Sequence, residues 1–245
     1  MIIKRHTDIP ADTETKKQIL ESVYGVYSQW VERFPLACRK GCGACCTRSV
    51  TVTSLEGEVI LDFVRKNGRE EWLREKLARA GAGKNKAGVT MNQFAAACLN
   101  QRETEGDLQD SWDFTPCIFL AENICSIYAV RPFGCRSFGS LEECAAGSTA
   151  VMAPIHLAVN TVFSQIIEHV SSDGGYCSYM TDILQSLAGS RNRDGASRLL
   201  PALPIPGFLL DSREMQVVKV LLQQLREQYP EETIFGDLID NFLPI

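Results

Sequence analysis

The chain lacks the features that mark a membrane or nucleic-acid-binding protein. No stretch approaches the roughly 18 consecutive apolar residues that cross a bilayer. Lys4 and Arg5 are not followed by the apolar run of a signal peptide. The net charge is −5 and no block of Lys or Arg compensates for it, which argues against a nucleic-acid partner. We therefore expect a cytoplasmic protein that binds neither membrane nor nucleic acid.

Histidine is also scarce, which limits the metal sites and catalytic pairs that the chain can form. The three histidines, His6, His156 and His169, are scattered along the chain. His156 and His169 fall in one expected helix but too far apart to share a metal ion. No cysteine–histidine pair stands out, so the sequence does not indicate a cysteine protease.

Cysteine, in contrast, is abundant, with ten in 245 residues. In a reducing compartment this number indicates metal or redox chemistry rather than disulfides. Eight of the ten form two blocks, and the short spacings of the first block suit a loop that wraps around a metal ion. The eight candidate metal ligands are Cys38, Cys42, Cys45, Cys46, Cys117, Cys125, Cys135 and Cys144.

Eight thiolates gathered in one region would repel one another unless cations lie nearby. Arg131 and Arg136 are interleaved with the second block and are candidates to donate hydrogen bonds to sulfur. The side chains of adjacent Cys45 and Cys46 point in different directions on most backbones. This suits two neighbouring metals, or one ligand beside a free or bridging thiol. Spacing leaves the metal open between zinc, iron and an iron–sulfur cluster.

Both blocks resemble the motifs of the YkgJ-like CxxCxxCC cysteine-cluster family. The matching stretches are Gly41–Cys46, Pro116–Leu120, Cys125–Tyr128 and Arg131–Arg136, although this chain has Pro-Cys where the family has Cys-Pro. The resemblance covers residues 36–146. It implies a zinc- or iron-chelating domain. One branch of the family resembles flagellin lysine-N-methylase, an enzyme associated with an iron–sulfur cluster.

Apolar spacing of three and four residues predicts helices over 12–34, 151–170, 176–187 and 212–228. Capping boxes beginning at Thr53 and Thr90 predict two more, and a further helix is expected over 70–80. A short strand is possible at 50–52, and the second cysteine block reads as loops and turns. The expected fold class is mainly α, a helical body with an irregular cysteine-rich metal-binding lobe.

We expect a single domain over 1–245, with the cysteine-cluster metal-binding region at 36–146 and a C-terminal helical extension at 147–245 packed on it. The leading functional hypothesis is a protein that chelates zinc or iron, including as an iron–sulfur cluster, through both blocks. The alternative is a protein-modifying enzyme resembling flagellin lysine-N-methylase. A deep pocket beside the cluster together with a methyl-donor site would favour the enzyme, and a closed, fully ligated site with no adjacent cleft would favour metal binding. Cys98 and Cys177 lie outside both blocks and read as structural thiols.

Overall fold

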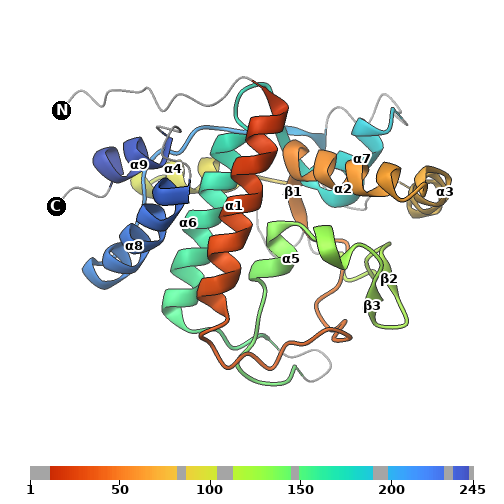
Figure 1. The fold of residues 1–245 in the computed structure, drawn as a ribbon, viewed down its shortest axis with the longest axis horizontal. Helices are drawn as coiled ribbons and strands as arrows, with labels where there is room; N and C mark the ends of the chain where they lie inside the picture. Colours follow the sequence, from red (N-terminus) through yellow and green to blue (C-terminus); the bar gives the residue numbers. More distant parts are fainter. Residues whose placement is uncertain are drawn as a thin grey trace.

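Helices dominate this computed structural model, which confirms the expected mainly-α fold class (Figure 1). The structure describes residues 12–81, 87–103, 113–144, 149–189, 198–228 and 234–242. The helices of the described residues are α1 (Thr13–Val31), α2 (Ser54–Lys66), α3 (Glu70–Ala80), α4 (Met91–Leu99), α5 (Phe133–Ser137), α6 (Pro154–Val170), α7 (Met180–Leu187), α8 (Ser212–Gln228) and α9 (Ile234–Phe242).

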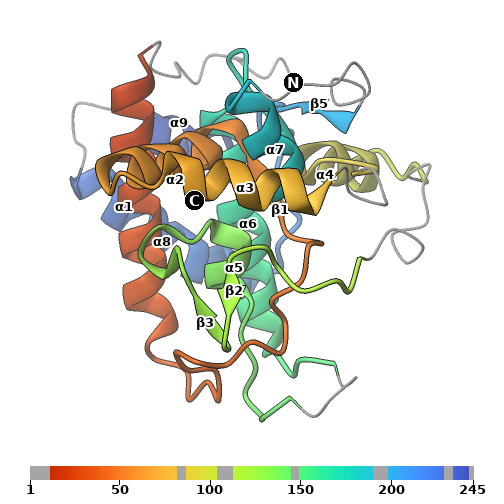
Figure 2. The same cartoon turned by 90° about the vertical axis from the view of Figure 1, so that its right-hand side faces the viewer.

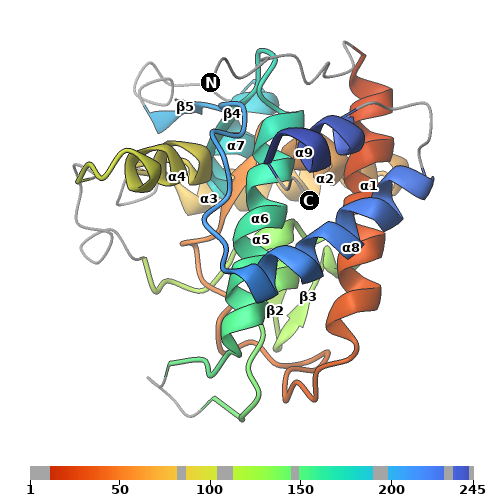
Figure 3. The ribbon, with the colours of Figure 1, turned by 90° about the vertical axis from the view of Figure 1, so that its left-hand side faces the viewer.

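The larger of two apolar cores lies between α1, α6, α8 and α9. α1 packs along α6, and α8 crosses both of them beneath α9 (Figure 3). Ile19, Tyr27 and Phe163 are fully buried there. Each such side chain contributes about 2 kcal/mol through removal from water, and Phe133 of the cysteine region packs into the same core against Tyr27 and Phe163.

A second core joins the cysteine region to α2, α3 and α7. Ile60, Leu73 and Ile183 come from the helices, while Phe119 and Ile127 come from between the cysteines of the second block. Phe119 and Ile127 are 0% and 1% exposed. The lobe around α5 lies below α2 and α3 in Figure 2. The apolar side chains of Phe119 and Ile127 attach this lobe to the helical body.

Local capping chemistry sets the helix starts as expected. Thr53 and Glu56 form a complete capping box before α2, and Thr90 and Gln93 form another before α4. The side chain of Asp12 accepts a hydrogen bond from the Thr15 amide at the start of α1. α1 ends at Val31, a few residues before the predicted boundary, because the chain there passes into turns.

The prediction of one continuous helix over 176–187 is wrong at its start. Residues Tyr176–Tyr179 form strand β4, and the helix begins only at Met180. β4 is the central strand of an antiparallel sheet, with β1 (Thr51–Thr53) on one side and β5 (Leu200–Pro201) on the other. Tyr176 and Tyr179 are three residues apart, a spacing that also occurs along one face of a helix, so the sequence pattern predicted a helix there. The backbone hydrogen bonds of this segment are made with β1 instead.

β1 overlaps the short strand considered at 50–52, whereas no local pattern in the sequence predicted β5 or α9. No helix in the described part of the chain is both long and apolar enough to cross a membrane.

Candidate metal centre

The first cysteine block lies in the loop that follows α1 and is fixed to a distant segment. The amide of Ala37 donates to the Ser140 carbonyl over 2.8 Å, and the Ser140 amide donates to Cys38 Sγ over 3.2 Å. Within the loop, the Cys42 amide donates to the Arg39 carbonyl over 2.9 Å. Gly41 closes this turn at φ +94°, a conformation that side chains other than glycine rarely adopt.

Backbone pairing brings the second block to the first. Thr47 and Pro116 form an antiparallel bridge. Beside it, the Cys117 amide donates to the Cys46 carbonyl over 2.9 Å, and the Arg48 amide donates to the Thr115 carbonyl over 2.9 Å. The end of the first block and the start of the second are therefore neighbouring strands of backbone.

A short hairpin positions Cys125. Its strands are β2 (Leu120–Ala121) and β3 (Ile124–Cys125), with Leu120 opposite Cys125. The connecting turn at Glu122 and Asn123 has φ values of 50° and 61°, as in the tight turns that asparagine tolerates. This hairpin turn agrees with the loops and turns expected for the second cysteine block.

Cys135 reaches the site on α5, which the 3₁₀-helix η1 (Tyr128–Val130) precedes. Glu56 of α2 holds the start of α5. Its Oε1 accepts hydrogen bonds from the Phe133 amide and from the Tyr24 hydroxyl, each over 2.7 Å. Because Glu56 is also part of the capping box of α2, one buried carboxylate links α1, α2 and the helix that carries Cys135.

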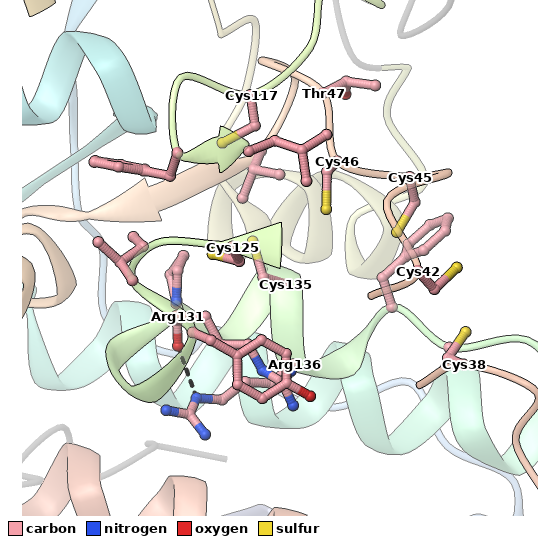
Figure 4. Close-up of a pocket in the computed structure, with 18 of the residues that line it drawn as sticks. Cys38, Cys42, Cys45, Cys46, Thr47, Cys117, Cys125, Arg131, Cys135 and Arg136 are labelled. Atoms are coloured by element: carbon pink, nitrogen blue, oxygen red, sulfur yellow. Dashed lines mark hydrogen bonds between the residues drawn. The ribbon is translucent and has the colours of Figure 1, made fainter. Parts of the chain in front are cut away.

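These elements enclose a cavity of about 190 Å³. Seven of the eight candidate ligands line it, and Figure 4 shows their sulfurs arranged around it: Cys38, Cys42, Cys45, Cys46, Cys117, Cys125 and Cys135. Cys144 is not among its lining residues, although its thiolate charge acts on Cys38. All eight thiols are free of disulfides. In the part of the chain that the structure describes, no three Cys, His, Asp or Glu side chains are grouped closely enough to hold an ion.

The thiols have the properties of a soft-metal donor set. Burial raises the pKa of Cys135, and the charges of Cys117 and Cys125 raise it further. A hydrogen bond with Cys46 raises the pKa of Cys45, and the same bond lowers that of Cys46. A cation in the cavity would remove the repulsion and stabilise the thiolates. The chemistry of the seven thiols that line the cavity therefore suits a zinc ion, or iron as an iron–sulfur cluster, although a bound metal would have to draw them closer together.

Both predicted arginines line the cavity, and both stack on tyrosines. The Arg131 guanidinium lies 4.0 Å from the centroid of Tyr128, and that of Arg136 lies 4.5 Å from the centroid of Tyr24. Arg136 Nε donates to the Arg131 carbonyl over 2.7 Å. These contacts hold two positive charges beside the sulfurs, and donation to sulfur itself stays a prediction.

The two remaining cysteines lie apart from this cavity. Cys98 is partly buried on α4. Cys177 lies on β4 and lines a second cavity of about 390 Å³, which the sequence analysis did not anticipate. Gly134, the residue before Cys135, lines the same second cavity. No sequence signal pointed to this second cavity, because its walls come from segments far apart in the chain, namely β1, α2, α4, α5, α6, β4 and β5.

Comparison with known proteins bears on the same region. Residues 37–152 match the model of the CxxCxxCC family, described as a "Putative zinc- or iron-chelating domain". No curated protein and no solved structure matches the chain. The matched segment contains both cysteine blocks and every residue that lines the cysteine cavity except Val31, Leu36 and Met180. The segment that carries both cysteine blocks, a little under half of the chain, is therefore similar to the CxxCxxCC family.

Proposed function

We propose that this protein chelates zinc or iron, the latter including an iron–sulfur cluster, through the two cysteine blocks together. The observation that supports this most directly is that seven cysteines from both blocks line one cavity. In this proposal the ligands are the eight cysteines of the blocks, and Arg131 and Arg136 offset their negative charge. The whole chain acts as one cytoplasmic domain, in which the region 147–245 is a helical extension that supports the metal site.

What the metal would contribute depends on its identity. A zinc ion held by four thiolates is redox-inert and stabilises the fold around it. An iron–sulfur cluster would add electron transfer at a potential set by nearby charges and hydrogen bonds. The chain's own part is the same in both cases: it supplies thiolates from two segments, excludes water with Phe119 and Ile127, and holds positive charge beside the sulfurs.

Metal content and visible absorption of anaerobically purified protein test this proposal. We expect bound zinc or iron in the wild type and less of it in both Cys42→Ser and Cys135→Ser. Cys98→Ala and Cys177→Ala are matched controls, because neither side chain lines the cysteine cavity, and should keep the wild-type content. A metal-free wild type, or full occupancy in Cys135→Ser, would contradict the proposal.

The second cavity favours a second candidate, a protein-modifying enzyme resembling flagellin lysine-N-methylase. The cavity reaches Gly134, directly before Cys135, and so lies next to the metal site. Glu56 and Glu168 line its wall, and their carboxylates accept hydrogen bonds from Phe133 and Tyr24 and from Asn92 and Leu203. Ser164 also lines this cavity, away from every cysteine of the two blocks.

For this candidate, metal-loaded protein is incubated with a lysine-containing peptide and S-adenosylmethionine, and the peptide mass is followed. A gain of one methyl group in wild type, lost in Ser164→Phe at unchanged metal content, would support the enzyme. Wild-type protein that leaves the peptide unchanged would remove this candidate and leave metal chelation standing.

A further inference from the structure

We propose that the eight cysteines form two separate four-cysteine centres, an inner and an outer one, and that the outer centre releases its metal first. This inference rests on the proposed function and states how its ligands are divided. The inner centre consists of Cys46, Cys117, Cys125 and Cys135, and the outer centre consists of Cys38, Cys42, Cys45 and Cys144.

The inner four are connected through backbone that packs on the second apolar core. Cys46 and Cys117 are joined by the 2.9 Å hydrogen bond between their main chains. Cys117 is linked onward to the hairpin, because the Leu120 amide donates to the Cys117 carbonyl over 3.0 Å and Leu120 pairs with Cys125. The fully buried Phe119 anchors this hairpin. All four inner cysteines are at least partly buried.

Cys135 joins them from α5, which the buried Glu56 fixes through the Phe133 amide. Figure 4 shows Cys46, Cys117, Cys125 and Cys135 together at one end of the cavity. A loop, a hairpin and a helix thus bring these four thiols to the wall of one cavity, where a bound metal would draw them closer together.

The outer four belong to loops near the surface. Cys38, Cys42 and Cys45 are exposed and lie at the other end of the cavity in Figure 4. Cys144 comes from the segment that pairs with this loop. The contacts between them are the Ala37–Ser140 and Ser140–Cys38 hydrogen bonds and an exposed ion pair of 3.2 Å between Arg39 and Glu143, the neighbour of Cys144.

The boundary between the centres falls between adjacent Cys45 and Cys46. Their thiols are hydrogen-bonded to each other, yet Cys46 lies toward Cys117 and Cys125, and Cys45 toward Cys42 (Figure 4). Each centre therefore takes three cysteines from one block and one from the other. This arrangement explains why two adjacent cysteines end the first block: one residue serves each metal.

The difference in support predicts a difference in lability. Metal release requires the ligand loops to open, and opening is easier where few buried contacts hold the backbone. The outer segments are held together by one backbone hydrogen bond, the hydrogen bond from the Ser140 amide to Cys38 Sγ and a solvent-exposed ion pair, which contributes at most about 1 kcal/mol. The inner centre cannot open without disturbing Phe119 and α5.

The test is chelator-driven release of Co²⁺ from the full chain loaded with Co²⁺, followed by the sulfur-to-cobalt absorption. We expect two equivalents in the wild type, released in two phases of equal amplitude, with the fast phase about tenfold faster or more. Cys42→Ser and Cys144→Ser should lose the fast phase, whereas Cys46→Ser and Cys117→Ser should lose the slow one. The variants of Cys46 and Cys144 are the decisive ones, because each of these two cysteines is assigned to the centre whose other three ligands come from the other block.

The inference is overturned if Cys46→Ser loses the same phase as Cys42→Ser, or if every variant loses both phases together. A wild type that binds no metal at all would instead contradict the proposed function. Should a serine variant fail to fold, Cys125→His and Cys42→His keep a ligand at the same position. They should change the absorption of only the slow and only the fast component, respectively, and a change in both components would overturn the division.

Discussion

The main chains of Cys46 and Cys117 are joined by a 2.9 Å hydrogen bond, so the two cysteine blocks meet through backbone pairing as well as around a cavity. The adjacent bridge between Thr47 and Pro116 extends this pairing. Part of the arrangement of thiols is therefore encoded in polypeptide geometry, and a metal would complete a site whose two halves already lie side by side.

Metal removal should melt the cysteine lobe and leave the helical body intact. The lobe consists mainly of turns and short elements, whereas α6 and α8 bury continuous apolar faces in the larger core. In hydrogen exchange on metal-free protein we expect faster exchange over 36–50 and 114–144 and unchanged protection in α6 and α8. Loss of protection along the whole chain would show that the metal holds the entire fold. Unchanged protection in both blocks would show a preformed site.

Cys98→Ala should leave metal content unchanged. Cys98 lies on α4, is only partly buried and does not line the cysteine cavity. Loss of its sulfur should lower the free energy of unfolding by about 1 kcal/mol or less. Metal analysis and urea unfolding check both points. Reduced metal in this variant would mean that the site extends beyond the two blocks.

Two helical glycines should respond in opposite ways to alanine. A Cβ on Gly57 of α2 would lie 2.5 Å from Ile183 Cγ2 and 2.8 Å from Leu187 Cδ1, so Gly57→Ala should destabilise the protein by about 2 kcal/mol. A Cβ on Gly25 of α1 meets nothing within 4 Å, and Gly25→Ala should stabilise by about 0.5–1 kcal/mol through helix propensity. Equal effects in thermal unfolding would contradict the close packing of α2 on α7.

Glu56→Gln should destabilise the junction of α1, α2 and α5. The carboxylate is 4% exposed and accepts hydrogen bonds from the Tyr24 hydroxyl and the Phe133 amide. The glutamine amide carries no charge, and its NH₂ group would face hydrogen-bond donors that need an acceptor. We expect this to lower the free energy of unfolding by about 2 kcal/mol. The exposed Glu75→Gln, which loses only a surface ion pair to Arg79, is the control and should change stability by less than about 0.5 kcal/mol. A similar result for both variants in urea unfolding would show that Glu56 does not hold the junction.

His169 should make stability fall as the pH is lowered. Its side chain is 2% exposed, and burial lowers its pKa from 6.5 to about 4. Between pH 6.5 and pH 4, the His169 side chain is mostly protonated in the unfolded chain and mostly neutral in the folded chain. This residue's contribution is therefore fully present above pH 6.5 and is lost toward pH 4, by at most about 1.4 kcal/mol per pH unit.

The measurement for His169 is the unfolding free energy of wild type and His169→Gln from pH 7.5 to pH 4.5. The variant should show a smaller slope, and the difference between the two curves isolates this residue from other titrating groups. Parallel curves would show that His169 is protonated equally in the folded and unfolded chains.

Local chemistry explains what the sequence by itself determined. Capping boxes at Thr53 and Thr90, apolar stripes in α1, α6 and α8, and the turn at Glu122–Asn123 act within a few residues of chain, so the pattern was sufficient to predict them. The eight cysteines and the family match over residues 37–152 likewise depend on spacing along the chain.

Only the tertiary structure decided which distant segments meet. Tyr176–Tyr179 became a strand because β1 offers it backbone partners, and no local pattern carries that information. In the same way, the meeting of Cys46 with Cys117 and the cavity beside Gly134 arise from segments far apart in the chain. The sequence shows which residues are cysteines, but long-range packing and backbone pairing determine which cysteines lie close together in space.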